Sequence, residues 1–206
     1  PVTVKLAESI RNPGGRSTGV HFLATDLTGK RLEILREMVP GLRRVVTFYD
    51  PKNRSAAESA KDGREAARHL GLEFVERHVA SVDELRTALR AFRSDQADAY
   101  LAVSDAMVSS QVDFVIDMAR TNKLPTMSIE QSFVTQGGLA SYSTDYRQVG
   151  QLSAKFIRRI LAGAKPAELA VERIDRVLLS INMKTAKSIG LAIPDSVLSR
   201  ADTLIE

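Results

Sequence analysis

Three short apolar stretches of the sequence are each followed by hydrogen-bonding side chains and then by a helical pattern. Open parallel sheets bind ligands at the carboxyl ends of their strands, and the helix that follows offers free N–H groups to an anionic group such as a carboxylate. Ser and Asp at such places are also common helix N-caps, so capping alone explains each group about as well as binding does. The groups are Tyr49, Asp50, Asn53 and Ser55; Ser104 and Asp105; and Glu130 and Phe133.

Other patterns that could support chemistry are weak. Gly14 to Gly19 has the glycine spacing of a phosphate loop, but Val20 and His21 follow where Lys and Ser or Thr are needed, and a strand follows where a helix is needed. The three histidines form no metal-binding pair, cysteine is absent, and no G-x-S-x-G nucleophile motif occurs. We therefore expect a protein that is not an enzyme, with no catalytic residue, cofactor or metal.

Composition limits the remaining classes. The chain has 206 residues, 44% hydrophobic and 26% charged, which suits one large or two small domains with a packed core. No run reaches the roughly 18 to 20 apolar residues that a membrane-spanning helix needs. Basic residues exceed acidic ones by 29 to 25 and are spread along the chain, so we expect no nucleic-acid partner. Because Pro1 is not preceded by an initiator Met or a signal peptide, we expect a mature or truncated segment.

Strand-like and helix-like periods alternate along the chain, which predicts an α/β fold with a parallel sheet and helices on both faces. Val45 to Tyr49, Ala99 to Val103 and Thr126 to Ile129 are the predicted inner strands. Further strands are predicted near Thr18 to Leu23, Phe74 to Val79, Leu139 to Tyr142 and Val177 to Ile181. The predicted helices begin at Val2, at Asp26 or Thr28, at Ser55, Ser81 and Ser109, at Thr144 or Asp145, and at Met183.

Four segments resemble the ABC-transporter substrate-binding proteins of the periplasmic binding protein type I fold, in the branch of tryptophan- and tyrosine-type receptors. They read "NPGGRSTGVHF", "GKRLEILREMVPGLRRVVTFYDPKN", "QGGLASYSTDY" and "INMKTAKSIGLAIPDSVLSRAD", and "KTAKSIGLAIPDSVL" is the most specific part. Family members are longer and have two lobes that close around a small solute. The resemblance implies that residues 25–142 and 176–206 form the second lobe, and that residues 1–24 and 143–175 are fragments of the first.

The resemblance also implies which residues contact the solute. The loop from Tyr49 to Ser55 would face the cleft, and Tyr142 and Asp145 lie at a crossing between lobes. An aromatic amino acid would want stacking partners such as Tyr49, Phe133 or Tyr142. We expect Asp105 to hold the ammonium of an amino acid, and the helix near Ser55 to hold its carboxylate.

The function implied is the solute-binding component of an ABC importer, located in the periplasm or outside the cytoplasm, with the permease subunits as partners. The alternative is the effector-sensing core of a transcription regulator, which uses the same fold after a DNA-binding segment that this sequence does not contain. We also expect self-association, because the predicted helix after Asp145 has an apolar stripe whose family partner lies in the first lobe. The stripe consists of Val149, Leu152, Phe156, Ile157 and Ile160.

Overall fold

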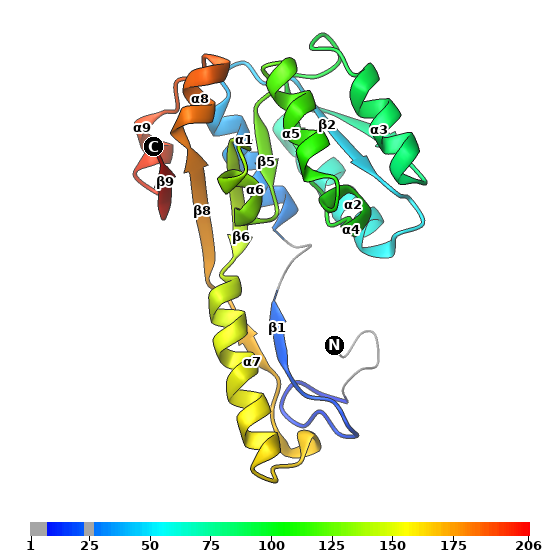
Figure 1. Ribbon diagram of the computed structural model, residues 1–206, viewed down its shortest axis with the longest axis vertical. Helices are drawn as coiled ribbons and strands as arrows, with labels where there is room; N and C mark the ends of the chain where they lie inside the picture. Colours follow the sequence, from blue (N-terminus) through cyan, green and yellow to red (C-terminus); the bar gives the residue numbers. More distant parts are fainter. Residues whose placement is uncertain (1–7, 23–26) are drawn as a thin grey trace. The chain divides into compact units, whose positions relative to one another are not determined.

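A computed structural model describes residues 8–22 and 27–206 (Figure 1). The chain divides into two compact units. Of the described residues, the larger unit contains 27–143 and 178–206, and the smaller contains 8–22 and 144–177. Their assignment to the second and first lobes of a receptor stays a prediction.

The larger unit is built on a seven-stranded sheet in the order β3-β2-β4-β5-β6-β8-β9. The pairs β2–β3, β2–β4, β4–β5, β5–β6 and β8–β9 are all parallel, which confirms the predicted α/β class and the three inner strands. The register places Val46 beside Tyr100 and Tyr100 beside Thr126. The strands are β2 (Arg44–Tyr49), β3 (Glu73–His78), β4 (Ala99–Leu101), β5 (Thr126–Ser128), β6 (Ala140–Thr144), β8 (Val177–Asn182) and β9 (Thr203–Ile205).

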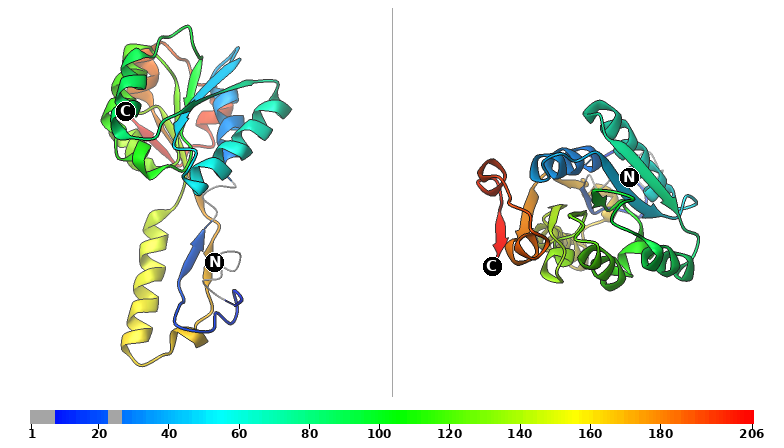
Figure 2. Two further views of the ribbon diagram at one scale, coloured as in Figure 1. Left: turned by 90° about the vertical axis from the view of Figure 1, so that its right-hand side faces the viewer. Right: turned by 90° about the horizontal axis from the view of Figure 1, so that it is seen from above.

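Helices cover both faces of this sheet (Figure 2). On one face, Leu32 and Leu35 of α1 are fully buried against Val45, Leu101 and Met127 of the strands. On the other, Leu85 and Leu89 of α3 and Val115 of α5 pack around Phe48 and Tyr100. The helices are α1 (Thr28–Met38), α2 (Arg54–Leu70), α3 (Val82–Ala91), α4 (Ala106–Ser109), α5 (Val112–Thr121), α6 (Gln131–Thr135), α8 (Met183–Ile189) and α9 (Asp195–Leu198).

Some predicted helix starts are wrong. Asn53, not Ser55, caps α2, because the Asn53 side chain accepts hydrogen bonds from the backbone N–H groups of Ser55 and Ala56. Thr28 does not cap α1; its hydroxyl is buried and bonded to the hydroxyl of Ser59. The caps predicted at Ser81 and Asp145 are confirmed.

Two further segments differ from the prediction, and two other predictions fall largely outside the described residues. The helix predicted from Ser109 to Asn122 is two helices, because α4 ends at Ser109 and α5 begins at Val112. The tail after Pro194 contains α9 and the edge strand β9, which pairs with β8 from Ser180 to Asn182. The helix predicted from Val2 to Ile10 and the cap at Asp26 fall mostly or wholly outside the described residues.

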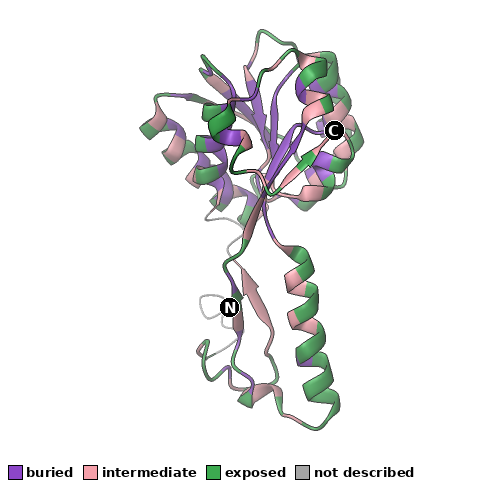
Figure 3. Ribbon diagram, turned by 90° about the vertical axis from the view of Figure 1, so that its left-hand side faces the viewer, coloured by how far each residue is buried: buried purple, intermediate pink, exposed green. Residues whose placement is uncertain are grey.

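The smaller unit has a two-stranded parallel sheet, β1 (Val20–Phe22) with β7 (Glu172–Ile174), and the helix α7 (Tyr146–Leu161). A short 3-10 turn, η1 (Pro166–Glu168), precedes β7. Phe156 is the one buried residue of α7, whereas Ile157 and Leu161 are 58% and 83% exposed. Figure 3 shows this contrast between α7 and the buried strands of the larger sheet. Among the described residues, no helix is long and apolar enough to cross a membrane.

Candidate functional site

The loops after β2, β4 and β5 lie at one edge of the larger sheet, because these strands are parallel neighbours. Each loop leads into a helix: α2, α4 and α6. The prediction that polar groups gather at this carboxyl edge therefore agrees with the topology, while their contact with a ligand stays a prediction.

Asp105 holds two of these loops together. Its side chain is buried, with 1% exposed, and one carboxylate oxygen accepts a 2.8 Å hydrogen bond from the backbone N–H of Asp50. The other oxygen accepts from the N–H groups of Met107 and Val108, at 2.9 and 3.3 Å, and so caps α4. Asp105 thus links the loop after β2 to the loop after β4. A direct contact of this carboxylate with a ligand ammonium stays a prediction.

The loop after β2 is shaped by its own side chains. Asp50 Oδ1 accepts from the N–H of Lys52 at 2.9 Å, and Asn53 Oδ1 accepts from those of Ser55 and Ala56. Ser55 is exposed in the first turn of α2. Its hydroxyl is therefore not used to cap the helix. The predicted role of Ser55 near a ligand carboxylate thus does not compete with a capping role.

Tyr49 belongs to a polar cluster at the end of β2. Its hydroxyl donates to Glu76 Oε2 at 2.6 Å and lies 3.0 Å from Nε2 of His78, and Arg64 donates to both oxygens of Glu76. Burial and the hydrogen bond to Glu76 raise the pKa of Tyr49 to about 12, whereas Arg64 lowers the pKa of Glu76. The Tyr49 ring meets His78 edge-on, with centroids 5.0 Å apart. Stacking of Tyr49 on a ligand stays a prediction.

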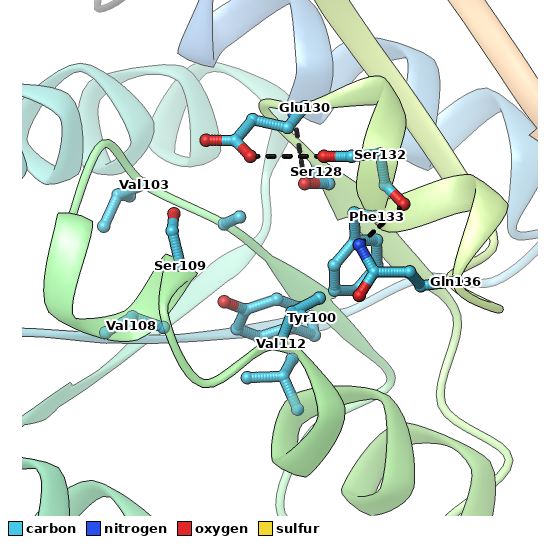
Figure 4. A pocket seen from close by; sticks show the side chains of 12 residues that line it. Tyr100, Val103, Val108, Ser109, Val112, Ser128, Glu130, Ser132, Phe133 and Gln136 are labelled. Carbon is cyan, nitrogen blue, oxygen red and sulfur yellow. Dashed lines mark hydrogen bonds between the residues drawn. The ribbon is translucent and has the colours of Figure 1, made fainter.

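A pocket of about 60 Å3 opens beside the loops after β4 and β5 (Figure 4). Glu130, which lines it, accepts a hydrogen bond from the Ser132 hydroxyl through Oε2, at 3.3 Å. Phe133 is buried in its wall, where the absence of a side chain at Gly138 leaves room for the aromatic ring. The structure therefore brings Glu130 and Phe133 together at one pocket, as two of the predicted site residues.

The remaining predicted residues lie elsewhere. Ser104 is half-buried in the loop after β4, beside Asp105. Tyr142 is half-buried against the hydrophobic core, and its backbone carbonyl accepts from Nε of the buried Arg31 at 2.8 Å. Asp145 is in the smaller unit, where it caps α7 and lies 3.6 Å from Arg176.

Five polar residues of the pocket are not among the predicted site residues: Tyr100, Ser109, Ser128, Ser132 and Gln136. Tyr100 reads as a core residue of an apolar strand, and Ser128 as the end of one. Both line the pocket, together with Ser109 and Gln136. A tyrosine in the middle of a buried strand is the signal that could have found the first of them, because a buried Tyr hydroxyl usually has a partner. Among the described residues, no group of three or more His, Cys, Asp and Glu could hold a metal ion.

Comparison with known proteins identifies a family and solved structures with the same fold. The profile of the family described as ABC transporter substrate binding protein matches residues 1–205. The chain belongs to this family. The curated tyrosine-binding protein of Clostridioides difficile is 23% identical over 192 residues, which are 93% of this chain and 54% of that protein. The chain thus spans about half the length of this curated relative.

Two solved structures are similar over nearly the whole chain. A conserved domain protein from Vibrio cholerae superposes with a TM-score of 0.86 and 28% identity, over 99% of this chain and 68% of that one. An ABC domain from Streptococcus pneumonia, solved in complex with L-Trp, has a TM-score of 0.85 and 26% identity, over 100% of this chain and 70% of that one.

Proposed function

We propose that this chain is the solute-binding part of an ABC importer and that it binds an amino acid, with aromatic amino acids as the first candidates. The observation that carries the proposal is the family match over residues 1–205, in a chain whose parallel sheet gathers three polar loops at its carboxyl edge. One relative is a tyrosine-binding protein, and another was solved in complex with L-Trp.

The loops offer suitable groups for such a solute. The exposed Ser55 at the start of α2, Ser104 and the carboxylate of Glu130 are hydrogen-bonding groups on three successive loops. The positive end of the dipole of α2, a helix of 17 residues, favours a carboxylate nearby, while Asn53 accepts from the N–H groups of Ser55 and Ala56. We assign the larger unit to the second lobe of the receptor and the smaller unit to part of the first, with the permease subunits as partners and a location outside the cytoplasm.

Isothermal titration calorimetry and thermal shift with the twenty L-amino acids test the proposal. A ligand at about a hundred times its dissociation constant stabilises the folded state by roughly 2.7 kcal/mol, so a true ligand raises the melting temperature clearly. We expect saturable binding of at least one of L-tyrosine and L-tryptophan. The proposal is wrong if none of the twenty gives heat or a shift at millimolar concentration.

We further propose that the chain self-associates through α7. Ile157, Ile160 and Leu161 are exposed on this helix, at 58%, 37% and 83%. Light scattering over a concentration series should show a mass above that of one 22.6 kDa chain, and Ile157→Lys with Leu161→Lys should return it to the monomer. Lys61→Ala, on the exposed face of α2, is the matched control. A monomer at all concentrations contradicts this proposal and leaves the amino-acid proposal standing.

A further inference from the structure

The pocket beside β4 and β5 contains a hydrogen-bond donor without an acceptor. Tyr100 lines this pocket and is 2% exposed, and among the described residues its hydroxyl has no hydrogen-bond partner. Burial and the charge of Asp105 raise the pKa of Tyr100, so the hydroxyl keeps its proton. The hydroxyl is not one of the fully buried side-chain atoms that lack a partner, so it is open to the pocket, where water or a guest can accept a hydrogen bond from it.

An unused acceptor lines the same pocket. Glu130 is the only Asp, Glu, Lys or Arg among the residues that line the pocket. Its Oε2 accepts from Ser132, and Oε1 has no hydrogen bond within the described chain. In Figure 4 the hydroxyl of Tyr100, the hydroxyl of Ser109 and the carboxylate of Glu130 lie around one side of the pocket. A guest that accepts from Tyr100 and donates to Glu130 would satisfy both groups.

The size and the walls of the pocket limit that guest. A cavity of roughly 150 Å3 holds a benzene molecule, whereas one water needs about 10 to 15 Å3. The pocket, at about 60 Å3, is therefore too small for an aromatic ring and large enough for a small polar group. Val108, Val112, Val115 and Phe133 line it with apolar surface, which strengthens a hydrogen bond made inside it.

We propose that this pocket receives a hydroxyl group of the solute, which accepts a hydrogen bond from Tyr100 and donates one to Glu130. The inference rests on the proposed function and narrows it to amino acids with a hydroxyl at the end of the side chain. A carboxylate is disfavoured by the charge of Glu130, and an apolar end leaves both groups unpaired. A tyrosine would insert its hydroxyl and keep its ring outside the pocket.

Two pairs of amino acids that differ by one hydroxyl test this directly. Calorimetry compares L-tyrosine with L-phenylalanine, and L-serine with L-alanine, on the full chain. We expect the hydroxyl to improve the affinity in at least one pair by about ten- to a hundredfold, as one buried hydrogen bond to a charged group does. Equal affinities within both pairs would overturn the inference and leave the amino-acid proposal standing. Absence of binding by every amino acid would overturn both.

Variants locate the effect in this pocket. Tyr100→Phe keeps the ring, and Glu130→Gln keeps the size of the side chain, so both should fold; their melting temperatures check this. Each variant should reduce the ratio of affinities between the hydroxylated amino acid and its counterpart without the hydroxyl by about fivefold or more. The loss should come chiefly from weaker binding of the hydroxylated amino acid. Glu73→Gln, an exposed glutamate on β3, is the charge-matched control and should keep the preference. A preference unchanged in Tyr100→Phe, or both amino acids weakened equally, contradicts the proposed contact.

Discussion

The two units of this protein use the same parallel β-α pattern at very different scales. The larger unit has seven strands and two extended hydrophobic clusters, with residues such as Leu32, Val46 and Leu101 completely buried. The smaller has two strands and one long helix, α7. Phe156 is the single buried residue of that helix. Two strands with one face covered are marginal by themselves, whereas a sheet covered on both faces is a stable platform. The comparison suggests that the larger unit alone can hold a binding edge rigidly.

Hydrogen exchange should show the largest difference between the units. We expect the backbone amides of β1 and β7 to exchange at least about a hundredfold faster than those of β2, β4 and β5, because few apolar contacts oppose local opening in the smaller unit. Mass-spectrometric or NMR exchange at neutral pH measures this. Equal protection in both sheets would contradict the comparison.

Removing the Asp105 carboxylate should destabilise the larger unit most among single changes at its edge. Asp105→Ala removes the cap of α4 and leaves the Asp50 N–H without its acceptor, so we expect a loss of about 2 to 4 kcal/mol in the free energy of unfolding. Glu65→Ala, on the exposed side of α2, should change it by less than about 0.5 kcal/mol. Urea denaturation measures both. A loss below 1 kcal/mol would mean that the link between the two loops does not stabilise the edge.

The start of α2 gives a sharper test on a smaller scale. Asn53→Ala should cost about 1 kcal/mol, because its side chain accepts from two backbone N–H groups of the first turn. Ser55→Ala should cost a few tenths at most, since its side chain is exposed and does not cap the helix. The same denaturation experiment compares them. The reverse order would restore Ser55 as the cap.

The smallest effect concerns pH. Arg64 lowers the pKa of Glu76 in the folded state, so the ionised Glu76 carboxylate stabilises the fold. This stabilisation is fully present above the unfolded pKa of a glutamate, about 4.3, and is lost as the pH falls through the lower folded pKa. Glu76→Gln should therefore lose less stability than the wild type between about pH 5 and pH 3. Glu73→Gln, on the same strand, should behave as the wild type. Melting temperatures measured across this pH range test the prediction. If the melting temperatures of all three proteins fall equally with pH, the hydrogen bond from Arg64 to Glu76 is not the cause.

Sequence patterns predicted the sheet better than the site. The apolar runs at Val45 and Thr126 and the helices between them require parallel pairing, because a helical crossover returns the chain in the same direction. Strand β9 was missed because three residues, Thr203–Ile205, are too few for a period to appear. The Ser-x-x-Glu pattern at Ser55 predicts a cap at Ser55, but the cap is Asn53, two residues earlier. The Glu58 side chain accepts a hydrogen bond from Nε of Arg54 and not from the backbone N–H of Ser55, as a capping box would require.

The candidate site depends on contacts that no local pattern contains. Asp105 was recognised as a cap or a ligand residue, but its bond to Asp50 joins residues 55 positions apart. Tyr49 was predicted as a stacking partner, and its hydroxyl is bound to Glu76 across the neighbouring strand. Tyr100 has the sequence surroundings of a core residue, and only the packing of α4, α5 and α6 leaves space beside its hydroxyl.

The central claim is that the carboxyl edge of the larger sheet binds an amino acid. NMR chemical-shift mapping on the isotopically labelled chain, titrated with L-tyrosine and L-tryptophan, tests it most directly. We predict saturable shifts at the backbone amides of the loops after β2, β4 and β5, including those of Ser55, Ser104 and Glu130, with the amides at the opposite ends of these strands unchanged. Saturable shifts confined to other parts of the chain, or none with either amino acid, would contradict the claim.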